Sequence, residues 1–372
     1  MTIIFYGIIG FLLGLLGITV YNVFSAPQLA KAPPVQSKPL VSVLIPARNE
    51  ESNIKACLDG LCAQEYPSLE ILVVDDDSTD ATASTVRDVV ERDGRAKLIR
   101  GKPLPPGWLG KNWACHQLSA QATGEIFIFV DADTRCAPSA VAHTVAWMID
   151  KKAGMLSAFP RQVTETLPEK LVVPVVYLFL YSFLPLRLAY RSRSEIFAAA
   201  NGQWIAFTRE AYRRIGGHRA VRDQIVEDVE LSRLAKRNGE RIVLTCGTGD
   251  LFCRMYGSWK TVWEGFSKNA FGLVGFRGGA LLGLMAVCFL AFIFPYVAIF
   301  IEPLARLAML AVFLNIALRL ILSLKYDQPL VGVLLHPFAI AFAMLIGLNS
   351  YRWYKTGKIR WKGRNLPDRP SA

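Results

Sequence analysis

Residues 126–134 read IFIFVDADT, an apolar run that ends in two carboxylates one residue apart. The run from Ile126 to Val130 is continuous and rich in β-favouring side chains, which is typical of a strand covered on both faces. In open α/β sheets the carboxyl ends of the strands form the crevice that binds ligands. Asp131 and Asp133 stand at such an end and could hold a divalent cation against a diphosphate. A lone Asp-x-Asp is more often a polar turn, so this stretch needs support from the rest of the chain.

Strands and helices alternate on the amino-terminal side of this stretch. Apolar runs predict strands, apolar residues at helical spacing predict helices, and the segments between them are polar or rich in Pro and Gly. The predicted strands are 41–45, 69–74 and 97–100, and the predicted helices are 53–64, 85–90 and 111–117. We expect the first of these strands to stop at Pro46. This order predicts an α/β fold with a doubly wound nucleotide-binding layer.

Three consecutive aspartates, 75–77, follow the second predicted strand. Ser78 or Thr79 could cap the helix that comes next, and capping would explain part of this polar cluster. It does not explain three adjacent like charges, which repel one another unless a cation or a donor-rich ligand accepts them. A second candidate ligand position therefore lies at this strand end.

Composition points to a membrane protein. The 372 residues are 52% hydrophobic, and the mean hydropathy is +0.31, which is high for a purely soluble chain. The net charge is +12, but no dense Lys/Arg run with interleaved aromatics suggests nucleic-acid binding, so we attribute the charge to membrane-surface and phosphate-facing residues. The seven cysteines are odd in number and lack Cys-x-x-Cys spacing, which predicts reduced thiols in a cytosol-facing domain.

The first 25 residues predict a transmembrane helix. Residues 3–24 carry no charge and are long enough to cross about 30 Å of hydrocarbon. No basic segment precedes them, so we expect an uncleaved anchor and not a signal peptide. Lys31 and Lys38 lie in the linker 26–39, and the positive-inside rule then puts the next domain, 40–278, in the cytoplasm.

Three more apolar stretches, 279–301, 303–323 and 329–349, lie within a predicted membrane region at 279–350. Arg306 and Arg319 are costly inside lipid, so the second stretch is expected to face a polar groove, to snorkel, or not to cross fully. Three crossings would leave the basic tail, 351–372, outside, so we expect one stretch to be re-entrant or interfacial. Residues 171–190, with prolines at 174 and 185, predict either an interfacial helix or a buried core helix.

Four motifs in order resemble those of the family 2 glycosyltransferases: VLIPARNEE at 43–51, VVDDDSTD at 73–80, DAD at 131–133 and ED at 227–228. Those are inverting enzymes with a GT-A fold, and the similarity covers roughly 40–275. The stretches at 105–114 and 361–364 further resemble the membrane-anchored branch that glycosylates carotenoids, hopanoids and related lipids. The resemblance implies a GT-A-type domain with a Rossmann-like mixed sheet, flanked by amino- and carboxyl-terminal transmembrane helices.

The resemblance also implies roles on the donor side. Asp76 would read the uracil imide, with the base and ribose lined by Pro46, Ala47, Arg48 and Glu50. Asp77 stands where the family motif commonly has glycine. Lys111 would offset the charge of the diphosphate. Asp131 and Asp133 would hold Mg²⁺ or Mn²⁺ against the two phosphates, with Asp131 also counted among the donor-binding residues.

On the acceptor side, the resemblance makes Asp228 the general base and Glu227 a residue that orients its loop. Acidic residues at a helix start are also what the helix dipole favours. The small-residue turn formed by Asn201, Gly202 and Gln203 would permit close approach of the acceptor, although tight packing explains such a turn equally well. The family's usual Gln-x-x-Arg-Trp signature is absent, and Lys268 is a hypothetical diphosphate contact in its place.

The sequence therefore predicts an inverting hexosyltransferase, integral to a bacterial-type plasma or internal membrane. We expect it to move glucose from a nucleotide-sugar donor, UDP-glucose, to a hydroxyl or carboxyl of a carotenoid or hopanoid-type lipid acceptor. Polyprenyl phosphate, a glycerolipid or a sphingolipid are alternatives within the same class. A membrane nucleotidyltransferase on a similar fold is the alternative from another class, and the intact carboxylate set argues against an inactive scaffold.

Overall fold

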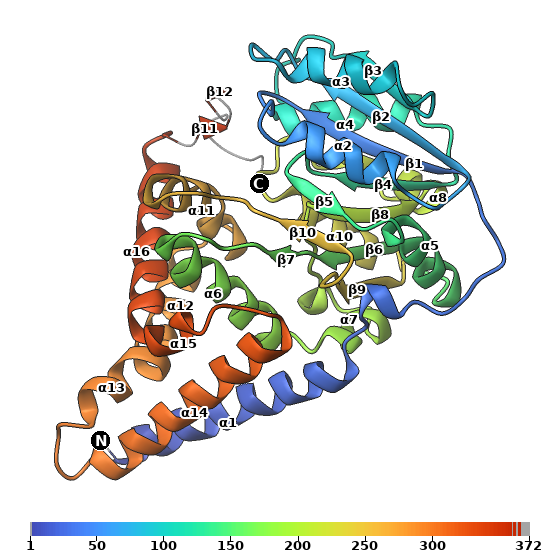
Figure 1. Ribbon diagram of the computed structural model, residues 1–372. Helices are drawn as coiled ribbons and strands as arrows, with labels where there is room; N and C mark the ends of the chain where they lie inside the picture. Colours follow the sequence, from blue (N-terminus) through green and yellow to red (C-terminus); the bar gives the residue numbers. More distant parts are fainter. Residues whose placement is uncertain (1, 359, 362–363, 366–372) are drawn as a thin grey trace. The chain divides into compact units, whose positions relative to one another are not determined.

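The computed structural model describes residues 2–358, 360–361 and 364–365, which form two compact units (Figure 1). The sheet unit contains Ala26–Arg161 and Leu186–Arg254, together with the described residues from Trp361 on. The helical unit contains residues 2–25, Gln162–Pro185 and the segment from Met255 up to residue 360. Part of the 361–364 motif and most of the basic tail lie outside the described residues.

A seven-stranded mixed sheet forms the centre of the sheet unit, in the order β3-β2-β1-β4-β8-β6-β9. The strands are β1 (Val41–Ala47), β2 (Leu69–Asp75), β3 (Ala96–Arg100), β4 (Ile126–Val130), β6 (Met155–Phe159), β8 (Trp204–Thr208) and β9 (Ile242–Cys246). β1 lies parallel to both β2 and β4, with Val43 opposite Ile71 and Ile128, whereas β8 is antiparallel to β4 and β6. The carboxyl ends of β1, β2 and β4 therefore meet at one edge, as the α/β fold predicts.

Helices and a small second sheet complete the sheet unit. The helices are η1 (Leu29–Lys31), α2 (Ile54–Cys62), α3 (Thr82–Val90), α4 (Gly110–Gln121), α5 (Ala140–Asp150), α7 (Leu186–Arg191), η2 (Glu195–Phe197), α8 (Arg209–Arg214), α9 (Gly217–Ala220) and α10 (Glu227–Arg237). The small sheet has the order β5-β10-β7, formed by β5 (Thr134–Cys136), β10 (Leu251–Cys253) and β7 (Arg161–Gln162). The short β11 (Arg360–Trp361) and β12 (Arg364–Asn365) form a separate pair.

Two local predictions in this unit are wrong. Pro46 does not end the first strand, because the ladder with β4 stops at Leu44 while the ladder with β2 continues to Ala47, where a residue without an N–H is tolerated. Neither Ser78 nor Thr79 caps α3. The Asp80 carboxylate instead accepts the backbone N–H of Thr82 at 3.0 Å.

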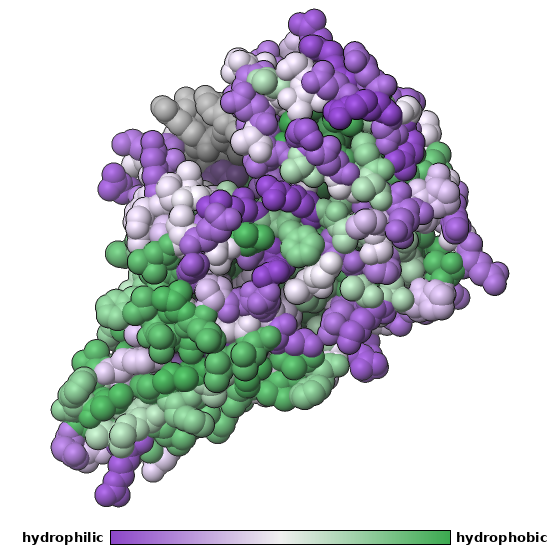
Figure 2. Space-filling model, in the orientation of Figure 1, coloured by the Kyte–Doolittle hydropathy of each residue, from purple (hydrophilic) through white to green (hydrophobic). Residues whose placement is uncertain are grey.

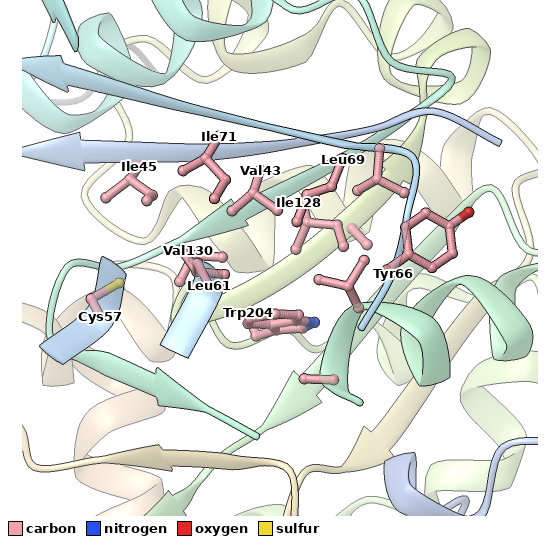
Figure 3. Close-up of a cluster of buried hydrophobic side chains, with 14 of the residues drawn as sticks. Val43, Ile45, Cys57, Leu61, Tyr66, Leu69, Ile71, Ile128, Val130 and Trp204 are labelled. Carbon is pink, nitrogen blue, oxygen red and sulfur yellow. The ribbon is translucent and has the colours of Figure 1, made fainter. Parts of the chain in front are cut away.

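Alternating apolar side chains from the central strands build the core of the sheet unit (Figure 3). Val43, Ile71 and Ile128 lie side by side on one face of the sheet, in one cluster with Leu61 of α2 and Trp204 of β8. The indole N–H of Trp204 donates to the Thr144 hydroxyl at 3.0 Å, which satisfies its only polar atom. This packing fixes the strand ends on which the candidate site is built.

Apolar helices make up the helical unit: α1 (Thr2–Ser25), α6 (Leu167–Phe183), α11 (Trp259–Leu273), α12 (Gly278–Cys288), the π-helical η3 (Phe289–Ile293), α13 (Phe294–Ala298), α14 (Ala305–Lys325), α15 (Val331–Leu334) and α16 (His336–Lys355). Three helical segments in the described chain are long and apolar enough to cross a membrane: Thr2–Ser25, Gly278–Ala298 and Ala305–Lys325. Figure 2 shows apolar side chains gathered over the surface of α1, α13 and α14.

The third expected carboxyl-terminal stretch, 329–349, is divided between α15 and α16 and is not among these three segments. The stretch 329–349 is therefore the candidate for the one that does not fully cross. The side of the membrane on which the tail lies stays a prediction. Arg306 is exposed in the first turn of α14. Arg319 is 0% exposed and donates to the Pro174 carbonyl at 2.9 Å and the Gly332 carbonyl at 3.3 Å, so it neither snorkels nor faces solvent.

The segment 171–190 is not one helix. α6 ends at Phe183, and α7 begins at Leu186 in the other unit. Pro174 lies within α6 and does not end it, and most of this helix is buried. Buried polar bonds join it to α1, including one from the Asn22 amide to the Tyr181 carbonyl at 2.7 Å. These contacts favour the buried-helix interpretation of α6 over the interfacial one.

Candidate active site

The loops that follow β1 and β2 are bonded to each other at the edge of the sheet. The Arg48 guanidinium donates to the backbone carbonyls of Asp76 and Asp77, the latter at 3.0 Å. The Asp76 N–H donates to the Ala47 carbonyl at 2.8 Å. The Glu50 N–H donates to the Thr82 hydroxyl at 2.8 Å. The structure thus joins the two loops that carry the residues predicted to bind the base and ribose.

The backbone conformation of Asp77 explains why glycine is common at its position in the family motif. Its φ is +60°, in the left-handed region that glycine adopts freely and that aspartate tolerates better than most residues. The Asp77 side chain is 84% exposed, whereas Asp76 is 3% exposed. The tight turn is therefore kept, and Asp76 is the carboxylate held at the sheet edge.

Lys111 lies between two carboxylates that are distant in the sequence. Its ammonium is 2.8 Å from Asp131 Oδ1 and 2.8 Å from Glu227 Oε1. Burial alone would lower the pKa of Lys111, but Asp131 and then Glu227 more than offset it and hold this pKa well above its usual value. Burial would likewise raise the pKa of Glu227, yet Lys111 holds it below its usual value. Glu227 therefore pairs with Lys111, a contact that the sequence did not predict.

Asp133 is the second carboxylate after β4, and its surroundings suit a cation. Burial first, and then the charges of Asp131 and Glu50, raise the pKa of Asp133 to about 7. The buried Oδ1 of Asp133 has no hydrogen-bond partner in the described part of the chain. Crowded carboxylates with an orphaned oxygen are suited to a hard divalent cation, so Asp131 and Asp133 fit Mg²⁺ or Mn²⁺. No cluster of three or more His, Cys, Asp or Glu side chains suitable for a metal occurs among the described residues, so these two would supply only part of its coordination.

The predicted general base is oriented by backbone donors. Asp228 Oδ2 accepts the Gly202 N–H at 2.8 Å, and Asp228 Oδ1 accepts the Val229 N–H at 2.8 Å. The turn predicted to face the acceptor thus contacts the first turn of α10. Within that turn the Asn201 N–H donates to Ser157 Oγ at 2.8 Å. The Gln203 side chain is buried and donates to the Cys253 thiol at 2.9 Å, so it packs against β10.

One pocket collects residues from both predicted halves of the site. Its empty volume is about 250 Å³, part of which is open solvent. The lining residues are Pro46, Lys111, Cys115, Phe129, Val130, Asp131, Gly202, Ile205, His218, Glu227, Asp228 and Leu231. Asp131 after β4 and the two carboxylates at the start of α10 therefore face a common space, as a donor site next to an acceptor site requires.

Two residues of this region escaped the sequence analysis. His218 is buried in the pocket wall, where its Nδ1 lies 2.7 Å from the Tyr212 hydroxyl and burial lowers the pKa of the ring to about 3. Asn112 is buried beside Lys111, and its amide donates to the carbonyls of Val221 at 2.7 Å and Gln224 at 3.0 Å. A single histidine gives no sequence signal, whereas Asn112 at least stands inside the 105–114 motif.

Lys268 lies on α11 in the helical unit. Its suggested contact with the diphosphate stays a prediction. The other predicted site residues lie in the sheet unit.

Comparison with known proteins identifies relatives of this chain. Residues 42–214 match the sequence model of glycosyl transferase family 2. A Staphylococcus aureus (strain bovine RF122 / ET3-1) protein named 4,4'-diaponeurosporenoate glycosyltransferase is 26% identical over 351 residues, which cover 87% of each chain. The protein of the same name from Staphylococcus haemolyticus is 26% identical over 232 residues. That match covers 62% of this chain and spans only 60% of the relative.

Two further matches concern a lipid-modifying enzyme and a solved structure. A Nostoc protein named beta-monoglucosyldiacylglycerol synthase is 33% identical over 150 residues, 39% of this chain and 32% of its own length. The mannosyltransferase PcManGT from Pyrobaculum calidifontis, solved in complex with GDP-Man and Mn²⁺, superposes with a TM-score of 0.57 at 20% identity. The superposition covers 94% of this chain and 99% of that chain, and it establishes the GT-A fold.

Proposed function

Because this chain is a family 2 glycosyltransferase with a GT-A fold, we propose that it transfers a hexose from a nucleotide sugar to an apolar membrane acceptor. We propose glucose, carried by UDP, as the hexose and a carotenoid or hopanoid-type lipid as the acceptor. The observation that carries this proposal is the similarity to 4,4'-diaponeurosporenoate glycosyltransferase over 87% of each chain. That similarity is too long to be confined to residues 42–214, so it supports a shared acceptor chemistry as well as a shared catalytic domain.

A glycerolipid is the second candidate acceptor. The Nostoc relative is named for a diacylglycerol product, which favours this alternative, but its match covers only 39% of this chain. Polyprenyl phosphate and sphingolipids remain candidates from the sequence alone.

In the proposed donor site, the neighbouring loops after β1 and β2 bind the base and ribose, with Asp76 accepting the ring N–H. Asp131 and Asp133 would hold Mg²⁺ or Mn²⁺, which when bound stabilises the negative charge on the departing nucleoside diphosphate. Lys111, fixed between Asp131 and Glu227, adds a permanent positive charge beside the same carboxylates. Its high pKa keeps it charged at every pH at which the enzyme is expected to work.

On the proposed acceptor side, Asp228 acts as the general base. The acceptor oxygen attacks the anomeric carbon as the bond to the diphosphate breaks, and Asp228 takes the hydroxyl proton. Attack from the face opposite the leaving group inverts the anomeric centre. The N–H groups of Gly202 and Val229 each hold one Asp228 oxygen, which fixes the direction of its lone pairs.

The pH dependence should report this base. Burial first, and then the charge of Glu227, raise the pKa of Asp228 to about 7. Only the ionised carboxylate can accept a proton, so kcat/KM for a hydroxyl acceptor should fall about tenfold per pH unit below this pKa and level off above it. A profile measured from about pH 5 to about pH 9 tests this, and a rate that does not change across neutral pH would contradict it.

Asn112 should position the loop that leads into α10, the helix whose first turn carries the proposed general base, Asp228. Asn112→Asp keeps the shape of the side chain but replaces the donating amide with a carboxylate. The carboxylate cannot donate to the carbonyls of Val221 and Gln224 and would repel them. A misplacement of the base by about 1 Å can lower the rate about 10²-fold, so we expect kcat to fall about 10- to 100-fold. UDP affinity, measured by calorimetry, should change little. Asn238→Asp is the matched control, because Asn238 is exposed and its amide donates to the Leu234 carbonyl. Equal kcat values for the two variants would refute the role.

The reaction type is tested by its products. Membranes that contain the chain are incubated with UDP-glucose, Mg²⁺ and extracted lipids. Release of UDP with a lipid heavier by one hexose supports glycosyl transfer, whereas release of glucose 1-phosphate with a uridylylated product would indicate a nucleotidyltransferase. Mass analysis of lipids from hosts with and without the chain then identifies the acceptor, and the absence of any hexose-bearing lipid would refute the proposal.

We further propose that the three apolar helical segments anchor the enzyme in a bacterial membrane, with the catalytic domain, 40–278, in the cytoplasm. Lys31 and Lys38 support this orientation by the positive-inside rule. A cysteine placed near the carboxyl terminus should react only with reagents that reach the cytoplasmic side. Labelling from outside alone would overturn this topology.

A further inference from the structure

The segment from α7 through η2, Leu186–Phe197, presents a basic surface that the catalytic proposal does not use. Arg187 and Arg191 are four residues apart and therefore share one face of α7. Arg193 follows in the turn, and all three arginines are exposed. None of the three forms an ion pair within the described chain. η2 adds Ile196, whose side chain is 82% exposed.

α10 holds this segment from behind. The buried ammonium of Lys236 donates to the carbonyls of Ala189 and Ser192, where α7 ends. Arg237 Nε donates to Glu195 Oε1 at 2.8 Å. Glu195 is the only acid in the segment, and it is engaged by Arg237. The outer side of the segment therefore carries three positive charges with no neighbouring acid of its own.

The position of this segment in the chain indicates the partner that the three arginines contact. α6 ends at Phe183, and α7 starts directly after Pro185, the last residue of that stretch of the helical unit. Arginines next to an apolar region, together with an exposed isoleucine, are typical of segments that contact the headgroup layer of a membrane. Guanidinium groups also match phosphate oxygens in a two-pronged geometry.

We infer that the α7–η2 surface binds the phosphate groups of anionic lipids at the membrane surface, with Ile196 entering the interfacial layer. The partner is a bilayer that carries anionic headgroups, and charge complementarity selects it over a neutral bilayer. η2 leads within a few residues to Gly202, whose N–H bonds Asp228, so lipid binding steadies the acceptor side of the site. The inference rests on the proposed membrane location but not on the identity of the acceptor.

Lipid retention by the purified full chain tests this inference without any activity measurement. The chain in detergent is offered equal phosphatidylglycerol and phosphatidylcholine, and bound lipids are counted by native mass spectrometry. We expect the wild type to retain phosphatidylglycerol preferentially and R187Q/R191Q/R193Q to lose this preference, by about fivefold in affinity for each charge removed. R87Q/K97Q/R213Q is the matched control, since it removes three exposed charges elsewhere on the sheet unit.

Three results would overturn the inference. One is equal retention of phosphatidylglycerol by the wild type and R187Q/R191Q/R193Q, and another is an equal loss in the control. The third is binding of polyglutamate through the three arginines in place of phosphatidylglycerol, which would make the partner an acidic protein. Because retention is read without a substrate, it stays decisive even if the chain glycosylates none of the acceptors offered.

A second measurement connects the surface to the site. In nanodiscs with a rising phosphatidylglycerol fraction, the acceptor KM of the wild type should fall, and added salt should reverse the effect. UDP affinity should not change with lipid. R187Q/R191Q/R193Q should show neither the lipid nor the salt dependence, and a variant that keeps both would count against the lipid contact.

Discussion

Asp133→Asn is expected to abolish sugar transfer while leaving the fold intact. The amide has the same shape as the carboxylate but is a poor ligand for a hard cation, so the charge on the departing diphosphate would lose its main stabilisation. We expect kcat to fall by at least about 10³-fold, on the scale of lost oxyanion stabilisation. The Oδ1 of Asp133 has no partner to lose among the described residues, and an asparagine oxygen can still accept the hydrogen bond from the Cys253 thiol. The thermal midpoint without metal should therefore not decrease.

Metal-dependent stability separates this loss from misfolding. Mn²⁺ with UDP should raise the thermal midpoint of the wild type, because a ligand that binds only the folded state stabilises it. The same addition should leave Asp133→Asn nearly unchanged. Asp150→Asn is the matched control, since Asp150 is half-exposed at the end of α5 and pairs with Lys151. Normal turnover by Asp133→Asn would remove this residue from the metal site.

Asp228→Asn is expected to bind donor normally and to lose transfer to hydroxyl acceptors. The single asparagine oxygen can still accept the Gly202 N–H, so the turn should keep its place, while the Val229 N–H in the first turn of α10 loses its side-chain acceptor. The amide cannot accept a proton from the acceptor, and loss of general base catalysis lowers kcat about 10²- to 10⁴-fold. Glu230→Gln is the matched control on the same helix, because Glu230 pairs with Arg233.

The chemical form of the acceptor changes the size of this effect. A carboxylate acceptor has no proton to lose. Transfer to a carotenoid carboxylate should therefore survive Asp228→Asn far better than transfer to a hydroxycarotenoid. Calorimetry with UDP serves as the binding control. Unchanged transfer of sugar to the hydroxyl acceptor would show that Asp228 is not the base.

Local patterns predicted the fold well because the signals of strands and helices act over a few residues. The continuous apolar run at Ile126–Val130 predicted β4, and the strand-end rule then placed the aspartates at the ligand edge of the sheet. Two predictions were wrong because they used only neighbouring residues. A proline ends a strand only where its missing N–H would break a hydrogen-bonded ladder, and Pro46 does not break the ladder with β2. The path of the loop before α3 determined that Asp80, and not Ser78 or Thr79, accepts the Thr82 N–H.

The resemblance to the glycosyltransferase family predicted more of the candidate site residues than any local pattern did, but it could not predict which of them contact one another. Asp77 shows the difference, because the motif only placed it where glycine is common, whereas the structure shows that it adopts the left-handed φ of +60°. His218 gave no signal in the sequence, and Asn112 stood in the 105–114 motif without any indication of its contacts. Both matter only through the elements that the fold packs around them, namely the pocket wall and the loop before α10.

The sequence by itself determined the α/β class, the apolar helices and the strand ends that carry Asp76, Asp131 and Asp133, because these depend on residue type and spacing along the chain. The tertiary structure alone decided that Lys111 joins Asp131 to Glu227, and that the Gly202 N–H holds the proposed base. It also buried Arg319 against two backbone carbonyls within a helix that is long and apolar enough to cross a membrane. Side-chain pairing depends on which elements, distant in the sequence, the topology brings together, and a local sequence pattern contains no information about that proximity.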